Sequence, residues 1–581
     1  MLQRRKNMSH KQRREQMMLK RAVKRGDISP PPPLKPDRRV RKPRRAKNSQ
    51  PVDPTVRRLE SSFVKLPKHF LKRTDILASQ LPLTRPVLPE AAILSDIDKQ
   101  PPAAADGQPL PELTCIKRPK WRYDMSKNEV EANEQGLFRK WLEQTAAAVD
   151  AWCSVEPAPE PAAQQAQPQA QEPEVPKKPE EMPHAPTSFE RNLEVWRQVW
   201  RVTEISQILL ILLDSRCPTL HFPPALVSFL ASAAPPDRVR AILVLTKVDI
   251  AGPARADAWT RYLRARHPGL RIVHVESYVE KTFGPDATAE ARKRALEPQL
   301  PSAFRAALVD ALREAHAELL QPPEEVRADA RRLAKWKPRV KASVDWDAVL
   351  KAQGGKVGTA VGPGGHARKH SKAASDEHPA HAHAGEEGHR EDERPEEEGE
   401  PDVLTIGVIG QPNVGKSSLL NALFGTHKVK ASRTPGKTKH FQTLFWTSEV
   451  RLVDCPGLVF PNYVPMETQV LSGILPIARV SATPLCVHHA AQLLPLEAAL
   501  ELAHPALAEP QPEYDSKRTW RPGMQPHSAK EKEKERQLPW TAMDILTAYA
   551  LRKGWITARV GGPDVKRAGN ASTSSLSLYL R

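Results

Sequence analysis

The sequence is poor in cysteine. Its 581 residues include five cysteines, which are scattered along the chain and form no CxxC pair: Cys115, Cys153, Cys217, Cys455 and Cys486. A disulfide framework or a cysteine-based zinc site needs paired or regularly spaced cysteines, so both are disfavoured. We expect a reducing compartment.

Long apolar runs are also missing. No stretch of about 20 apolar residues could cross a bilayer, and the N-terminus is basic without the apolar centre of a signal peptide. We therefore expect an intracellular, soluble protein with no membrane partner. Apolar residues make up 39% and aromatic residues 5% of the chain, and prolines number 58. This composition predicts fewer folded domains than the three or four that about 150 residues per domain would allow.

Acidic residues are scarce near the N-terminus. Residues 1–50 hold 18 Lys or Arg and 3 Asp or Glu, which is +15 of the formal net charge of +20. Such an arm predicts a polyanionic partner, with RNA as the candidate. The alternative is a solvated, disordered tail or a nuclear address. A basic helix is predicted over residues 9–26.

Two low-complexity segments interrupt the chain. Residues 154–186 are rich in Pro, Ala, Gln and Glu, and residues 350–400 contain a histidine cluster followed by an acidic run. The histidines could bind a metal, but nothing in the segment fixes ligand geometry, so a solvated insert is the preferred interpretation.

An α/β pattern occupies the region between these segments. Strands are predicted at 208–213, 241–245 and 271–275, with helices between them. This alternation predicts a parallel sheet with helices on both faces and ligands at the carboxyl ends of its strands. Upstream, Ser126 with Glu129 and Thr187 with Glu190 each predict a helix-starting capping box.

The stretch 402–425 carries the strongest chemical signal. An apolar strand leads into residues 410–417, which fit G-x-x-x-x-G-K-[ST], and a leucine-rich helix follows. Glycines let backbone N–H groups converge on phosphate oxygens, and the helix N-terminus adds positive potential. Lys416 would reach the β- and γ-phosphates, and Ser417 would offer its hydroxyl to magnesium.

Two further motifs lie at predicted strand ends. Asp454-x-x-Gly457 follows a strand, where the carboxylate can hold magnesium through water and the Gly457 N–H can sense the γ-phosphate. Thr246-Lys-Val-Asp249 resembles the [NT]KxD guanine reader, because a carboxylate can accept two guanine N–H groups that adenine cannot present together. An ordinary turn sequence is the alternative for this tetrapeptide.

The order of the motifs is unusual. The guanine reader precedes the phosphate loop by about 160 residues, whereas in most GTPases it follows DxxG. Circular permutation explains this order, since it is allowed where original termini lie close together. Ser528-Ala529-Lys530 imitates the final SAK motif but lies in a charged run with no strand before it.

Together the motifs resemble the circularly permuted GTPases of ribosome assembly, in the branch of guanine nucleotide-binding protein-like 1 and large-subunit GTPase 1. The likeness is carried by DSRCP, WRQVWRVTEIS, PNVGKSSLLNALFG, SRTPGKTKHFQT and DCPGLVFP. It covers most of 187–280 and 402–505, and more loosely 113–145 and 540–570.

The resemblance implies roles for matched residues. Thr438 would be the switch threonine on magnesium, and Asn413 would recruit potassium. Leu458 stands where other GTPases place a water-orienting glutamine, and Glu276-Ser277 departs from the usual final motif. The implied catalytic residues are Lys416, Thr438, Asp454 and Gly457, and the implied magnesium ligands are Ser417, Thr438 and Asp454. The implied nucleotide-binding residues are Thr246, Lys247, Val248, Asp249, Glu276, Ser277, Gly410, Gln411, Pro412, Asn413, Val414, Gly415, Lys416, Ser417, Ser418, Asp454, Cys455, Pro456 and Gly457.

The predicted architecture is an α/β, circularly permuted P-loop GTPase fold with a small C-terminal helical unit and a disordered basic arm. Its segments are the arm (1–55), a partly helical extension (56–153), a linker (154–186), the base-binding half with following helices (187–349), the insert (350–400), the phosphate-binding half (401–480) and a helical region (481–581).

The predicted function is slow hydrolysis of GTP, with magnesium and potassium as cofactors. The expected setting is large-subunit biogenesis in the nucleus, nucleolus and cytoplasm. We expect a monomer that binds pre-ribosomal particles or the large subunit, with RNA held by the arm. The alternatives are a GTP-gated scaffold without hydrolysis, a P-loop ATPase, and an RNA-binding factor of another pathway.

Overall fold

The computed structural model describes residues 18, 61–84, 110–122, 124–153, 181–233, 238–280, 296–353, 402–429, 442–475, 480, 482–508, 538–557 and 561–571. The chain divides into residues 1–54 and a compact unit of residues 55–581, and the second unit contains nearly all of the described residues. Apart from Met18, the predicted helix over 9–26 lies outside the described residues. So do Thr438 and most of the two low-complexity segments.

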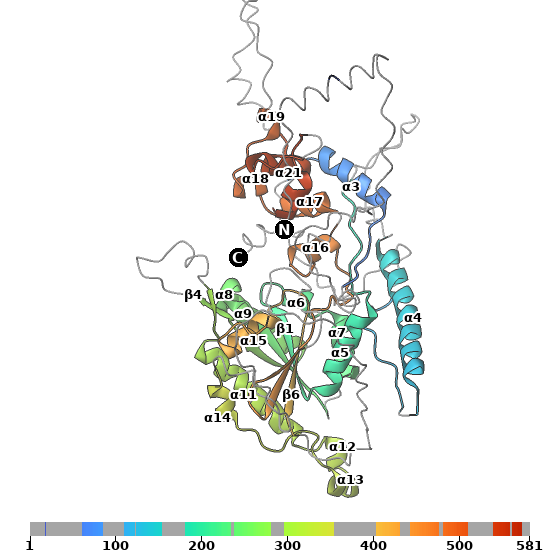
Figure 1. The fold of residues 1–581 in the computed structure, drawn as a ribbon, viewed down its shortest axis with the longest axis vertical. Helices are drawn as coiled ribbons and strands as arrows, with labels where there is room; N and C mark the ends of the chain where they lie inside the picture. The colour runs from blue at the N-terminus through green and yellow to red at the C-terminus, as the bar shows by residue number, and fades with distance from the viewer. Residues whose placement is uncertain are drawn as a thin grey trace, which may run out of the picture. The chain divides into compact units, whose positions relative to one another are not determined.

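A six-stranded sheet forms the centre of the fold, in the order β3-β2-β1-β6-β8-β7 (Figure 1). The first five strands run parallel, and β7 pairs antiparallel with β8. The predicted parallel sheet is therefore confirmed, with one antiparallel edge strand. The strands are β1 (Ile208–Asp214), β2 (Arg240–Thr246), β3 (Arg271–His274), β6 (Leu404–Ile409), β7 (Gln442–Phe445) and β8 (Val450–Asp454).

Strand register brings the predicted motifs to one edge of this sheet. Asp214 pairs with Thr246 across β1 and β2, and Val408 pairs with Asp454 across β6 and β8. The central strand β6 pairs with β1, which precedes it by about 190 residues. The two halves of the chain thus complete one sheet, as permutation requires.

The two faces of the sheet bury alternate residues of the same strands, as pleating demands. One face packs Leu209, Ile211 and Leu213 against α5, α7 and α9. The other packs Ile208, Leu210 and Leu212 against α11, α14 and α15. The helices are α5 (Leu193–Ile205), α7 (Pro224–Ala233), α9 (Pro253–Arg266), α11 (Ser302–Leu319), α14 (Trp346–Lys351) and α15 (Lys416–Phe424).

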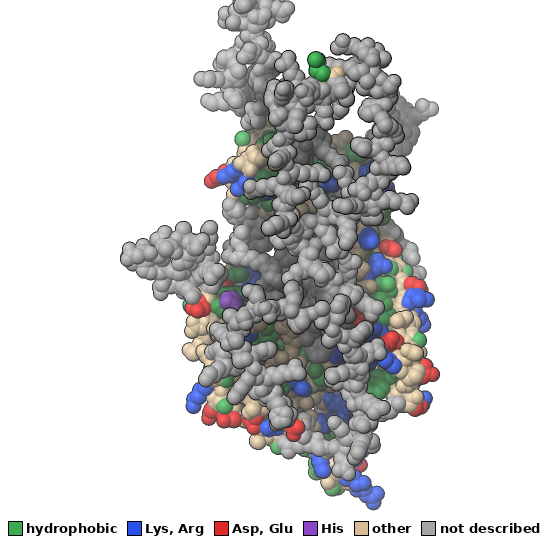
Figure 2. All heavy atoms as spheres, in the orientation of Figure 1, with side chains coloured by type: hydrophobic (Ala, Val, Ile, Leu, Met, Phe, Trp, Pro, Cys, Tyr) green, Lys and Arg blue, Asp and Glu red, His purple; other side chains and the backbone are tan. Residues whose placement is uncertain are grey.

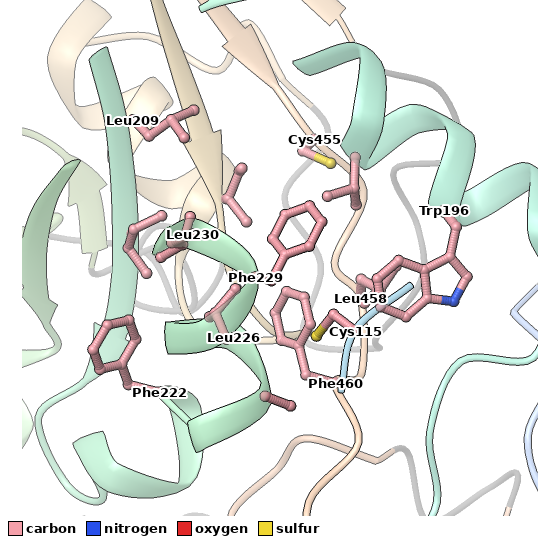
Figure 3. Close-up of a cluster of buried hydrophobic side chains, with 14 of the residues drawn as sticks. Cys115, Trp196, Leu209, Phe222, Leu226, Phe229, Leu230, Cys455, Leu458 and Phe460 are labelled. Atoms are coloured by element: carbon pink, nitrogen blue, oxygen red, sulfur yellow. The ribbon is translucent and has the colours of Figure 1, made fainter. Parts of the chain in front are cut away.

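The segment after Asp454 is buried in the first of these cores. Leu458 and Phe460 are each 1% exposed, and Figure 3 shows them close to Trp196 of α5 and to Cys115. The Trp196 and Phe460 ring centroids lie 6.2 Å apart.

The two described helices of the N-terminal extension pack against different parts of the protein. Its first helix, α3 (Lys68–Gln80), packs against α17 (Thr483–Leu493) and α21 (Ala542–Arg552) of the C-terminal region (Figure 1). Its second helix, α4 (Lys127–Cys153), packs Trp141 against Trp196, with ring centroids 5.4 Å apart.

The remaining elements are short. They are α6 (Pro218–His221), α8 (Val248–Ala251), α12 (Glu324–Arg327), α13 (Ala330–Lys335), α16 (Met466–Leu471), α18 (Leu496–Ala499), α19 (Pro505–Ala508) and an antiparallel pair, β4 (Tyr278–Glu280) with β5 (Leu296–Pro298). Among the described helices, none is both long enough and apolar enough to pass through a bilayer.

One capping prediction is confirmed and the other is wrong. At α4, Ser126 N–H donates to Glu129 Oε2 (2.8 Å) and Glu129 N–H donates to Ser126 Oγ (3.3 Å). The helix expected after Thr187 begins instead at Leu193, where the Asn192 side chain accepts the Glu194 N–H. Glu190 is buried and accepts the Ser62 and Asn192 N–H groups, so it braces the chain before the helix.

Several helices of the C-terminal half are short. Residues 323–337 form two of them, α12 and α13. Residues 491–503 hold the end of α17 and then α18, whose N-cap residue is Pro495.

Gly407 tests the packing of α5 on β6. A Cβ at this position would lie 2.4 Å from Ser206 Oγ and 2.8 Å from Val202 Cγ1. We expect Gly407→Ala to reduce the free energy of unfolding by roughly 1–3 kcal/mol, measured by denaturant unfolding. Gly136→Ala, on the exposed face of α4 with nothing within 4 Å, is the control and should stabilise the helix by up to about 1 kcal/mol. Equal stability of Gly407→Ala and the wild type would contradict this packing.

Candidate functional site

The turn from β6 into α15 has the backbone geometry of an anion-binding loop. Asn413 and Gly415 have positive φ values of 60° and 108°, a region that glycine and asparagine tolerate. A Cβ at Gly410 would lie 3.0 Å from the Leu212 carbonyl oxygen, so the loop passes close to β1. No side chain caps the N-terminus of α15, which leaves its first N–H groups for an anion.

Lys416 lies across this loop. Its Nζ donates to the carbonyl oxygens of Gly410 (2.8 Å) and Gln411 (2.7 Å), and the side chain is buried. Burial lowers the pKa of Lys416 to about 8, although the Asp454 carboxylate acts in the opposite direction. A desolvated ammonium group at the loop mouth is a strong attractor for phosphate oxygens.

Asp454 and Ser417 present oxygen atoms beside Lys416. Ser417 Oγ donates to Asp454 Oδ2 at 3.3 Å, and Asp454 Oδ1 is buried without a hydrogen-bond partner among the residues that the structure describes. Burial raises the pKa of Asp454 to about 6, against the lowering effects of Lys416 and Ser417. A buried carboxylate oxygen beside a hydroxyl matches the hard oxygen ligands that Mg²⁺ prefers, so these residues fit a magnesium ion.

Gly457 lies directly against the loop. A Cβ there would come within 2.8 Å of Pro412 Cα and 3.1 Å of Lys416 Nζ. The flanking residues are tied to β6, since Cys455 N–H donates to the Val408 carbonyl at 3.2 Å and Leu458 N–H to the Gly410 carbonyl at 3.4 Å. Only glycine allows this approach, which puts the DxxG backbone at the phosphate-binding end of the loop.

Thr246 joins the other half of the chain to the same loop. Its Oγ1 donates to the Val414 carbonyl at 2.6 Å, across 168 positions of sequence. The Thr246 carbonyl in turn accepts the Ser215 hydroxyl at 2.6 Å. Thr246 and Ser215 are both buried, so these hydrogen bonds hold the loop to the end of β2.

A buried charge cluster lies next to Thr246. Lys247, at φ 58°, donates from Nζ to Asp214 Oδ2 at 2.6 Å, and Arg216 donates to both Asp214 oxygens. Burial alone would raise the pKa of Asp214, but the Arg216 hydrogen bonds and the Lys247 charge hold it below its usual value. Asp249 lies close enough to Arg216 to interact with it electrostatically.

Comparison with known proteins agrees with this geometry. Residues 405–504 match the family described as 50S ribosome-binding GTPase. The chain is 31% identical over 475 residues to guanine nucleotide-binding protein-like 1 of Rattus norvegicus, covering 80% of this chain. It is 27% identical over 460 residues to large subunit GTPase 1 of Saccharomyces cerevisiae, covering 79% of this chain. The chain carries a circularly permuted P-loop GTPase domain.

The chain spans less than two thirds of the length of either relative. The matched region amounts to 63% of the rat protein and 55% of the yeast protein. A solved structure, GNP-bound YlqF from T. maritima, is 13% identical with a TM-score of 0.29, covering 66% of this chain and 94% of that chain.

Strand β4, which lies outside the six-stranded sheet, also reaches the loop. Tyr278 Oη lies 3.2 Å from Ser418 Oγ, at the first turn of α15. Burial, and then the charge of Asp249, raises the pKa of Glu276. The departure from the usual final motif therefore places a second carboxylate near the predicted guanine reader, while Ser277 is buried.

Most predicted site residues lie at this edge of the sheet. Thr438 lies outside the described residues. Asn413 is in the loop, but its Nδ2 donates to the Gly473 carbonyl at 2.9 Å, a contact from beyond the predicted site. Within the described residues, no group of three or more His, Cys, Asp or Glu side chains is placed to hold a metal ion together.

Sequence reasoning did not assign Asp214 or His221 to the site, and it did not foresee the contact that Gln411 makes with α6. Asp214 neutralises Lys247, and its position after a buried strand was a usable signal. Gln411 Nε2 donates to the Leu220 carbonyl at 2.7 Å, which ties the loop to α6. His221, next in sequence, is fully buried with its pKa lowered to about 3, first by burial. Neither the Gln411 contact nor the burial of His221 has a local sequence signature.

The raised pKa of Asp454 generates a pH prediction. The carboxylate must lose its proton to bind Mg²⁺, and with a pKa of about 6 it is ionised above that pH. We expect the Mg²⁺-dependent part of GDP affinity to weaken as pH falls below about 6, approaching about tenfold per pH unit. Fluorescent-GDP titrations with Mg²⁺ or EDTA between pH 5 and 7.5 measure it.

Asp454→Asn is the matched control for this titration, because it should lose both the Mg²⁺ effect and its pH dependence. A Mg²⁺ effect that is flat between pH 5 and 7 in the wild type would show that Asp454 is not the group that titrates.

Proposed function

We propose that this protein binds GTP with Mg²⁺ and hydrolyses it to GDP and phosphate, as a slow switch stimulated by a partner in large-subunit assembly. The observation that carries the proposal is the hydrogen bond from Thr246 to Val414. It joins the tetrapeptide of residues 246–249, which we propose reads guanine, directly to the phosphate loop, a contact that neither motif alone would establish.

The chain's own residues supply binding and positioning. Lys416 and the loop N–H groups would bind the β- and γ-phosphates, and Gly457 N–H would contact the γ-phosphate. Ser417 and Asp454, with Thr438, would hold Mg²⁺, which neutralises charge developing on the phosphates. Water attacks the γ-phosphorus, the bond to the bridging β,γ-oxygen breaks, and GDP leaves with that electron pair.

The side chains near the site are the reason why we expect slow intrinsic turnover. Leu458, at the position of a water-orienting glutamine, is 1% exposed and packs into the sheet core. Arg216 is held by Asp214. A leucine cannot orient the attacking water, and the Arg216 guanidinium is already engaged, so neither residue supplies stabilisation of the transition state. Because an arginine finger is worth on the order of 10³–10⁵ in rate, a partner or a bound cation at Asn413 would have to supply this stabilisation.

The ribosomal setting is supported by the relatives and by charge. One family description and one relative's name refer to ribosomes or the large subunit. On the face in Figure 2, basic and acidic side chains of the described residues are interspersed. Residues 1–50, which carry a formal net charge of +15, are therefore the proposed RNA contact. We propose that the protein resides where pre-ribosomal particles do, in the nucleus, nucleolus and cytoplasm.

Base recognition is the first test. Asp249→Asn removes the charged acceptor for guanine N–H groups, so we expect GDP affinity to fall on the order of 10–100-fold. Competition of GTP, ATP and GDP against a fluorescent guanine nucleotide measures it. Asp257→Asn, an exposed carboxylate on α9, is the control. If Asp249→Asn retained the preference for guanine, the assignment of Asp249 to base recognition would be wrong.

Turnover is the second test. We expect slow GTP hydrolysis by the protein alone and faster hydrolysis with large ribosomal subunits. We also expect the rate of hydrolysis to be higher in potassium than in sodium. The chain lacking residues 1–50 should bind RNA more weakly, with a smaller salt dependence. Fast, potassium-independent turnover without subunits would contradict the switch. GTP binding with no turnover under any condition would favour the scaffold alternative.

A further inference from the structure

A turn outside the predicted site contacts the P-loop. Asn413 Nδ2 donates to the Gly473 carbonyl at 2.9 Å. Gly473 ends α16 at φ 80° and its N–H donates to the Val470 carbonyl. The turn is therefore a fixed C-terminal cap, and its carbonyl is presented to the loop residue two positions before Gly415.

The helix that presents Gly473 is held by buried polar contacts. Gln469, 3% exposed, accepts the Ser188 N–H at 2.9 Å and donates to the Ser188 carbonyl at 2.9 Å and Thr187 Oγ1 at 3.1 Å. Glu467, also buried, accepts the Ala185 N–H and lies 2.6 Å from His184. A buried glutamine with three partners fixes α16 against residues 184–190, a segment we name the strap.

The strap also holds the segment after DxxG. Glu190 N–H donates to the Val459 carbonyl at 2.9 Å, two residues beyond Gly457. Val459 shares one hydrophobic cluster with Val470 and Leu475, which flank the Gly473 turn. These contacts form a continuous path, which we name the circuit, from the segment after Gly457 through the strap and α16 to Asn413.

This circuit fixes a side chain at the mouth of the loop. An asparagine on a positive-φ residue would otherwise sample several rotamers, and a side chain that must hold a cation beside the phosphates gains from being held in one rotamer. Resting on the proposed function, we propose that Gly473 and Gln469 are positioning residues, which set turnover by orienting Asn413. Because the chain runs from this turn into α17, a partner that moves the helical unit would alter the same contact.

The chain offers a matched pair of substitutions. Gly473 (φ 80°) and Gly554 (φ 64°) both end helices, and a Cβ at either would meet nothing within 4 Å. Alanine therefore introduces comparable backbone strain at both, while only Gly473 faces the P-loop. Gln469→Met, similar in volume but without hydrogen bonds, tests the strap, with buried Gln198→Leu of α5 as its control.

The test uses the full chain with Mg²⁺ in potassium, and measures kcat, KM and hydrogen exchange of residues 466–475 with and without GDP. We expect Gly473→Ala and Gln469→Met to lower kcat about fivefold, the scale of one lost hydrogen bond. KM should stay unchanged, and the exchange response to GDP should be lost. Gly554→Ala and Gln198→Leu should retain wild-type kcat and exchange response.

Equal effects of Gly473→Ala and Gly554→Ala, or no response of residues 466–475 to GDP in the wild type, would overturn the proposal. If the wild type shows the exchange response but no turnover, the contact with Asn413 stands and hydrolysis fails. If it binds no guanine nucleotide, the proposed function fails first.

Discussion

The hydrogen bond from the Thr246 hydroxyl to the Val414 carbonyl is the constraint on which the site depends. It is 2.6 Å long, buried, and joins two strand ends that are 168 residues apart. Thr246 is the last residue of β2, and Val414 lies in the loop after β6, two strands away. Removing it would leave a buried carbonyl unsatisfied beside the phosphate-binding loop, which is more costly than the bond's own net contribution.

The site also brings several ionisable side chains together where they are buried from solvent. Lys416 and Asp454 have pKa values displaced toward their neutral forms, both first by burial. Asp214 remains ionised only because Arg216 and Lys247 surround it. Such an arrangement favours a ligand that brings both negative charge and a divalent cation, because each partner neutralises a group that burial leaves under-solvated. Magnesium nucleotide fits that description, and either component alone fits it less well.

The sheet and the site were largely readable from sequence, because their signals are local. The strand of Ile208–Asp214, the glycines of the loop and the two motifs at strand ends each lie within a few residues. The failures are long-range. Glu190 looked like a capping partner, yet it accepts the N–H of Ser62, 128 positions away. The separation of α3 from α4, and the Gly473 contact to Asn413, depend on tertiary packing that no window of sequence contains.

Permutation also has a consequence for synthesis. Strand β1 consists of seven buried residues, and one of its neighbours, β6, begins roughly 190 residues later. At about 5–20 residues per second, a nascent chain would carry that apolar edge without its second neighbour for on the order of 10–40 seconds. An open hydrophobic strand edge invites pairing with other chains. Synthesis is therefore the stage at which this strand edge is most open to pairing with other chains.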